Sequence, residues 1–164
     1  MTATAIEPAG PASSAAVLRR GLLALAVAGT VGIALELLLL RHWTDGRQLV
    51  AWVALTALAV ALLLLRRPTR GAIRVARGLA IAVLVTSAIG VFVHVLANYE
   101  AAPLDARYTT SWETTAEPVR WLLAATDTVG PSPSLAPLAL AFVALVLLLA
   151  LVRHPVLEAD TPGI

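Results

Sequence analysis

Four long apolar runs alternate with short segments that are polar, arginine-rich or proline-containing. The first run covers residues 21–40, and the helices that the four runs predict cover about residues 18–40, 49–65, 78–98 and 135–152. Each is long enough to cross a hydrocarbon core of ~30 Å at a rise of ~1.5 Å per residue. A backbone in lipid must satisfy its own hydrogen bonds, so such runs are helices. The pattern predicts an all-α fold, an integral membrane four-helix bundle.

The polar segments define where the runs begin and end. Arg19 and Arg20 precede the first run, which ends at Arg41 without the small residues of a signal-peptide cleavage site, so we expect an uncleaved helix. Proline follows the second run at Pro68 and the fourth at Pro155, where it prevents the helix from continuing. We expect a disordered cytoplasmic tail over 1–16, a membrane domain over 17–155 and a cytoplasmic tail over 156–164.

Arginine positions predict the orientation in the membrane. Eight arginines flank the start of the first run, the connection between the second and third, and the end of the fourth. Four lie in the other two connections, together with six acidic residues. By the positive-inside rule the side with eight is cytoplasmic, which places both termini inside (N-in, C-in).

The second predicted outer connection, residues 99–134, is too long for a simple loop. Pro118 suits the first turn of a helix, residues 119–126 are mostly apolar, and Gly130 with Pro131 would end the helix. We therefore expect a short interfacial helix here. The four tryptophans, Trp43, Trp52, Trp112 and Trp121, all fall at this outer boundary, as a belt of interfacial anchors or as an aromatic ligand platform.

Small residues recur at four-residue spacing in two of the runs and predict close helix packing there. In the first run they are Ala24, Ala28 and Gly32, and the next position is Glu36; in the third they are Gly78, Ala82, Thr86 and Gly90, followed by His94 and Asn98. We expect Glu36 and His94 to lie at similar depth and to point into the bundle.

Composition supports the membrane assignment and excludes some chemistry. Hydrophobic residues make up 59% of the 164 residues and charged residues 13%, about half the fraction of a soluble domain. The chain has no cysteine, so disulfides and thiolate chemistry are excluded. All twelve basic residues are arginines flanking apolar runs, so the high isoelectric point does not indicate nucleic-acid binding.

Ionisable side chains inside a membrane span usually indicate a functional site. Glu36 is the acidic residue and His94 the histidine within the predicted spans, and the candidate ligand- or ion-binding residues near the outer boundary are Glu36, His42, Gln48, His94, Asn98 and Glu100. This cluster would either fix helix register through hydrogen bonds or form a small site. Glu36, His42, His94 and Glu100 are the candidate metal ligands, and two histidines could instead hold a haem.

The sequence supports other possible functions to different degrees. A carboxylate beside a histidine would also suit a proton-coupled carrier. Hydrolysis has little support, because Ser87 and His94 lie ~10 Å apart along one helix. Arg66, Arg67, Arg70, Arg74 and Arg77 are expected to contact anionic lipid headgroups, or alternatively to dock an acidic partner protein.

The chain resembles a group of uncharacterised small four-helix bacterial membrane proteins of actinobacterial type. The resemblance lies in the order of Glu36, His42, Gln48, Gly90, His94, Asn98 and Glu100, followed by the prolines from Pro131 to Pro137 and by His154-Pro155. The resemblance implies no activity. The sequence favours a non-enzymatic protein of the bacterial cell membrane whose polar cluster organises the bundle or binds a small ligand or ion. The alternatives are a proton- or metal-coupled transporter and an accessory subunit of a larger complex or homo-oligomer. No cofactor is specified.

Overall fold

A computed structural model describes residues 11–158 as helices joined by turns, with no strand in that part of the chain. The predicted all-α class is confirmed. Most of the predicted N-terminal tail, and residues 159–164 of the C-terminal one, lie outside the described residues. Residues 11–16, which the sequence placed in that tail, form the first turns of a helix.

Within residues 11–158, three helices are long and apolar enough to cross a membrane: α1 (Pro11–Leu39), α2 (Leu49–Leu64) with the preceding turn η1 (Gly46–Gln48), and α3 (Arg70–Ala101). The fourth apolar run forms the shorter helix α5 (Pro137–Ala150), which has 14 residues and spans ~21 Å. Three short turns and helices, η2 (Ala102–Leu104), η3 (Trp112–Thr114) and α4 (Glu117–Ala125), lie between α3 and α5, and α6 (Pro155–Glu158) follows α5.

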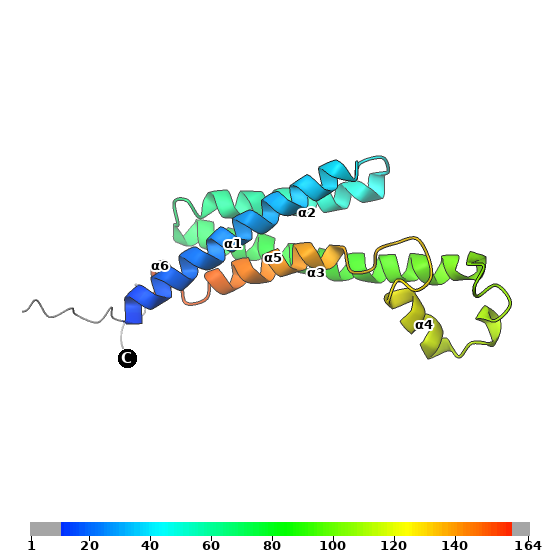
Figure 1. Ribbon diagram of the computed structural model, residues 1–164. Helices are drawn as coiled ribbons and strands as arrows, with labels where there is room; N and C mark the ends of the chain where they lie inside the picture. Colours follow the sequence, from blue (N-terminus) through cyan, green and yellow to red (C-terminus); the bar gives the residue numbers. More distant parts are fainter. Residues whose placement is uncertain (1–10, 159–164) are drawn as a thin grey trace, which may run out of the picture.

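The long helices pack side by side, with α3 against α2 and α5, and α1 against α2 and α5 (Figure 1). Their shared core is almost wholly aliphatic and includes Leu58, Ile73, Val83, Val143 and Leu147. On the outward-facing sides, large apolar side chains such as those of Val31, Ile89 and Phe142 are more than half exposed. An apolar interior with an equally apolar exterior is the arrangement expected of helices in lipid.

The predicted small-residue packing faces are largely wrong. Ala24, Ala28 and Gly32 are exposed on α1, as are Gly78 and Ala82 on α3. The buried positions are instead Ala26, Thr30, Ile33 and Leu37 on α1, and Ile73, Ala76, Ala80, Val83 and Ser87 on α3. These sets alternate steps of three and four residues, because a strict four-residue row drifts around a helix of ~3.6 residues per turn.

Two glycines do permit close approach. A Cβ atom at Gly29 would lie 2.6 Å from Cγ2 of Val143 on α5. A Cβ atom at Gly90 would lie 3.1 Å from Cβ of Pro137, the first residue of α5. Of the two glycines in the predicted α3 row, Gly90 makes such a contact and Gly78 does not, and Gly90 lies about two-thirds of the way along α3, beside the start of α5.

Beyond Gly90, α3 continues past the start of α5, and residues 102–136 fold back along this last part of α3 (Figure 1). We call residues 102–136 the connecting lobe. It has its own small core of Ala102, Trp112, Ala124 and Val129, against which Val95 and Tyr99 of α3 pack. The predicted short helix in this connection is present as α4, with Pro118 in its first turn.

Candidate functional site

The six candidate residues do not bond to one another in the structure. No hydrogen bond or ion pair joins any two of Glu36, His42, Gln48, His94, Asn98 and Glu100. Among the described residues, no group of three or more histidine, aspartate or glutamate side chains is placed to hold a metal ion. Whether these residues bind a ligand stays a prediction, but the geometry divides them among separate environments.

Glu36 does not point into the packed helices as the sequence analysis expected. Its side chain is exposed on α1, beside the buried stripe that includes Ile33 and Leu37. Glu100 is likewise exposed near the end of α3. The expectation failed for Glu36 because it followed the four-residue row of small residues, and that row lies on the outward face of α1.

His42 and Gln48 belong to the turn between α1 and α2. The backbone carbonyl of His42 accepts a hydrogen bond of 2.8 Å from the indole N–H of Trp52. The Gln48 side-chain oxygen accepts from the backbone N–H groups of Thr44 and Asp45, while Asp45 accepts from the backbone N–H of Arg47. This reciprocal capping box fixes the start of η1, so Gln48 has a local structural role.

Asn98 is the centre of the most connected polar group in the described chain. It is fully buried on α3. Its side-chain carbonyl accepts from the Ser132 backbone N–H at 2.7 Å, and its amide donates to the Ser132 carbonyl, also at 2.7 Å. The same amide lies 3.0 Å from the Ser134 hydroxyl and 3.2 Å from the Ala124 carbonyl. One side chain of α3 thereby satisfies backbone and hydroxyl groups at two places in the connecting lobe.

Asp127 and Ser134 complete this Asn98 network. The Asp127 carboxylate accepts from the Ser134 backbone N–H at 2.8 Å and from the Asn98 amide at 3.3 Å. These bonds, that to Ser134 first, lower the pKa of Asp127, and the nearby His94 acts in the same direction. The buried Ser134 hydroxyl donates to the Ala124 carbonyl at the end of α4. The network therefore closes the end of α4 onto α3.

His94 and Gly130 make further contacts between α3 and residues 130–134 of the connecting lobe. Nδ1 of His94 lies 3.0 Å from the carbonyl oxygen of Pro133. Gly130 adopts φ +83°, and a Cβ atom there would lie 2.5 Å from the Asn98 Cα. Only glycine combines this backbone conformation with so close an approach. The polar groups at this end of α3 are thus used to seat the lobe.

An aromatic group lies where Tyr99 of α3 meets the connecting lobe. The Tyr99 ring stacks on Trp121, with centroids 4.4 Å apart, and meets the edge of Trp112 at 5.4 Å. The Arg120 guanidinium lies 5.7 Å from the Tyr99 centroid and 5.8 Å from that of Trp112. Trp112 is buried, so within this group protein side chains already occupy the faces that an aromatic ligand platform would offer.

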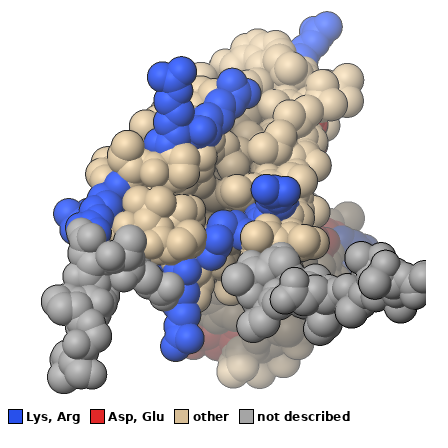
Figure 2. All heavy atoms as spheres, turned by 90° about the vertical axis from the view of Figure 1, so that its left-hand side faces the viewer, with Lys and Arg blue, Asp and Glu red and all other residues tan. Residues whose placement is uncertain are grey.

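The opposite end of the molecule carries a concentration of arginines (Figure 2). We call this the arginine end and define it as Arg19, Arg20, Arg66, Arg67, Arg70, Arg74, Arg77 and Arg153, which lie at the starts of α1 and α3 and beyond the ends of α2 and α5.

Three of these arginines donate to carbonyl groups at the C-terminal end of α5 or just beyond it. Arg19 donates to the Ala150 carbonyl at 3.1 Å, Arg77 to the Leu151 carbonyl, and Arg70 to the Val156 carbonyl at 3.3 Å. Cations at a helix C-terminus neutralise its partial negative charge and satisfy its unpaired carbonyls. His154 is buried among them, and burial followed by the charges of Arg19 and Arg77 lowers its pKa.

Three residues of the Asn98 network are not indicated by the sequence. Asp127, Ser132 and Ser134 looked like ordinary loop residues, and their distance from Asn98 along the chain, 34 residues for Ser132, hides the contact. The sequence of a polar loop with Gly130 between prolines and serines indicates a turn, but it does not indicate which helix the turn covers. Comparison of the chain with family models, curated proteins and solved structures gave no match.

Proposed function

We propose that the chain is a four-pass membrane protein of the bacterial cell membrane, with both termini and the arginine end in the cytoplasm. The gathering of eight arginines at one end supports this orientation. In this arrangement α5 is the fourth crossing, and at ~21 Å it is shorter than the hydrocarbon core. The turns that flank it and local thinning of the bilayer would make up the difference.

The absence of cysteine makes this topology directly testable. Gly71→Cys lies in the first turn of α3 at the arginine end, and Thr110→Cys lies in the connecting lobe; both positions are exposed. An impermeant maleimide added to intact cells should label Thr110→Cys alone, and should label Gly71→Cys only after the membrane is opened. Labelling of Gly71→Cys in intact cells would contradict the proposed orientation.

We further propose that the protein is a non-enzymatic accessory component that presents the connecting lobe, seated on the end of α3, to another component outside the membrane. The observation that carries this proposal is the complete use of the buried Asn98 side chain in holding Ala124, Ser132 and Ser134. A buried polar network that is fully bonded specifies one arrangement of the groups it joins. The polar residues at this end thus support the register-fixing alternative rather than a catalytic one.

The transporter alternative has lost its main support. It required Glu36 and His94 to act as a pair, whereas Glu36 is exposed on α1 and His94 contacts Pro133. We keep lipid contact as the role of the exposed arginines Arg66, Arg67 and Arg74. Arg70 and Arg77 also donate to carbonyls of the last helices, and so contribute to the fold as well.

The accessory role is tested by cross-linking in membranes. A photoreactive amino acid at Leu122, which is exposed on α4, should form a specific cross-linked product in the wild-type background. Asn98→Ala should abolish that product. The control is Glu100→Ala, which changes an exposed residue of the same helix as Asn98, α3, and should retain the product. A product that persists unchanged in Asn98→Ala, or no product from any exposed lobe position, would contradict the proposal.

A further inference from the structure

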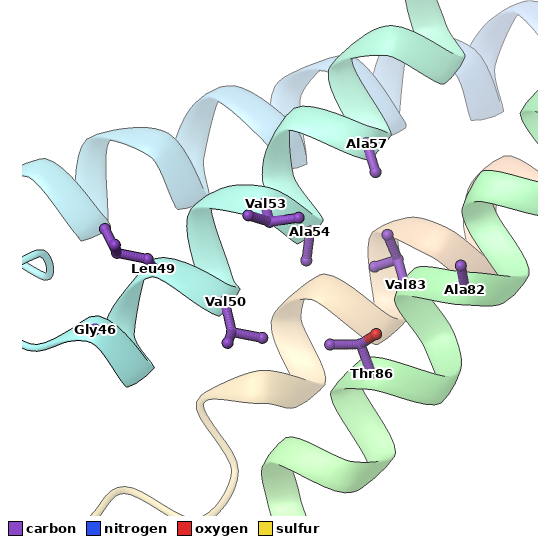
Figure 3. Close-up of a pocket in the computed structure, with 9 residues that line it drawn as sticks. All are labelled: Gly46, Leu49, Val50, Val53, Ala54, Ala57, Ala82, Val83 and Thr86. Atoms are coloured by element: carbon purple, nitrogen blue, oxygen red, sulfur yellow. The ribbon is translucent and has the colours of Figure 1, made fainter.

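An apolar groove lies between α2 and α3, where the two helices separate toward the start of α2 (Figure 3). Its volume is about 320 Å³. The lining is formed by aliphatic side chains and one threonine: Leu49, Val50, Val53, Ala54 and Ala57 from α2, and Ala82, Val83 and Thr86 from α3, with Gly46 of the preceding turn at one end.

The dimensions of the groove select the kind of group that would fill it. Along α2 it extends from Leu49 to Ala57, ~12 Å, which is most of one leaflet of a ~30 Å hydrocarbon core. A hollow of this length with almost purely aliphatic walls matches a hydrocarbon chain lying along α2.

We propose that this groove holds one acyl chain of a phospholipid from the leaflet in which α2 begins. The proposal rests on the membrane insertion of α2 and α3 proposed above. Its walls have the composition of an acyl-chain site, because every side chain that lines it, apart from Thr86, is purely hydrocarbon. An apolar hollow facing lipid is filled by chains, since an empty one forfeits dispersion contacts on all its walls.

Polar groups at the mouth fit the other end of the same lipid. Arg47 directly follows Gly46 and is exposed, and its guanidinium makes no hydrogen bond within the described residues. The neighbouring Asp45 carboxylate accepts from the Arg47 backbone N–H instead. An arginine at the end of an acyl-chain groove is placed to pair with the lipid phosphate, which its guanidinium can bind through two hydrogen bonds.

Thr86 supplies a further polar contact inside the groove. Its side chain is among those that line the groove (Figure 3). Thr30 and Thr56 donate to the carbonyl four residues earlier in their own helices, whereas the Thr86 hydroxyl has no hydrogen-bond partner within the described chain. That hydroxyl is therefore available to an oxygen of the bound lipid.

Native mass spectrometry of the full chain, released from nanodiscs containing phosphatidylglycerol, tests the site. We expect wild type to retain one phospholipid, and Ala82→Phe, which fills the groove from an exposed position, to retain none. The matched control Ala88→Phe is exposed on α3 outside the groove and should retain the lipid. Arg47→Gln should weaken retention about tenfold, as expected for loss of one charge-assisted pair.

Two results would overturn the lipid site. One is equal lipid retention by Ala82→Phe and Ala88→Phe. The other is a wild-type protein that carries no lipid but forms a dimer that Ala82→Phe dissociates, which would assign the groove to a second copy. Failure of the membrane topology itself would appear separately, in the maleimide labelling of Gly71→Cys and Thr110→Cys, so the two proposals fail by different measurements.

Discussion

The two ends of α3 are fastened to the rest of the molecule by different chemistry. At its last turns a neutral, buried amide, that of Asn98, bonds to the connecting lobe. At its first turns Arg70 donates to the Val156 carbonyl of α6, and Arg77 donates to the Leu151 carbonyl, directly after α5. A buried group left without partners costs its full desolvation energy, whereas an exposed or half-buried cation can return to water. The Asn98 end should therefore depend on single residues and the arginine end should not.

The largest expected effect is that of Asn98→Ala. It removes the partner of the Ser132 N–H and carbonyl and leaves a cavity beside Ser134. Loss of several buried hydrogen bonds should lower the free energy of unfolding in micelles by about 3 kcal/mol. Limited proteolysis should then cut within residues 126–134. The control Glu100→Ala, at an exposed position, should change stability by less than about 0.5 kcal/mol. Equal effects of the two changes would remove the distinction between the ends.

Gly130→Ala should have the next largest effect. The added Cβ would meet the backbone of Asn98, and the residue would hold φ +83°, which L side chains rarely adopt. Steric overlap and backbone strain together should cost about 2 kcal/mol or more. Gly78→Ala is the matched control, since a Cβ there meets nothing within 4 Å and the site lies inside α3. It should raise stability by about 0.5 to 1 kcal/mol, because alanine favours a helix over glycine. Thermal unfolding of both variants in one detergent gives the comparison.

At the arginine end the corresponding change, Arg77→Ala, should cost only about 1 to 1.5 kcal/mol. It removes the donor to the Leu151 carbonyl, but that carbonyl lies near the end of the packed helices, where Arg19 already bonds to the Ala150 carbonyl. Arg74→Ala, exposed and without a hydrogen bond in the described chain, should be nearly neutral in micelles. A loss for Arg77→Ala as large as that for Asn98→Ala would show that both ends depend on single residues.

Ser87, a second buried polar residue of α3, should respond to substitution in the opposite direction from Asn98. Ser87 is buried, and its hydroxyl has no hydrogen-bond partner within the described residues. Ser87→Ala removes an unsatisfied group and improves helix propensity, so it should raise the free energy of unfolding by about 1 kcal/mol. A decrease on this substitution would mean that the hydroxyl has a partner in the membrane-embedded protein.

The sequence predicted the features that depend on local pattern. Apolar run lengths indicated the helices, and Pro118 with the residues after it indicated α4. The pairing of residues across the fold was not predictable in the same way. Ala26 and Ala28 are chemically identical, yet only Ala26 is buried, and two residues of helix rotation decide which. Asn98 was recognised as a notable polar residue, but its partners lie on a loop whose docking depends on the close approach at Gly130.

The pH dependence of stability provides the smallest and most specific test of the arginine end. The pKa of His154 is lowered in the fold, because the side chain is buried and lies near Arg19 and Arg77. A histidine with a lowered pKa takes up its proton more readily when unfolded. Its neutral form therefore contributes stability that is fully present above the unfolded pKa near 6.5 and is lost as pH falls below that value toward the folded pKa. Unfolding midpoints measured from pH 8 to pH 5 should fall across this window, and His154→Gln should reduce the fall.

The Asn98 end should respond differently, because the pKa of Asp127 is lowered and its contribution is lost only at more acidic pH. If His154→Gln leaves the profile between pH 8 and pH 5 unchanged, the arginines do not govern the protonation of His154, and the chemical contrast between the two ends would rest on the hydrogen bonds alone.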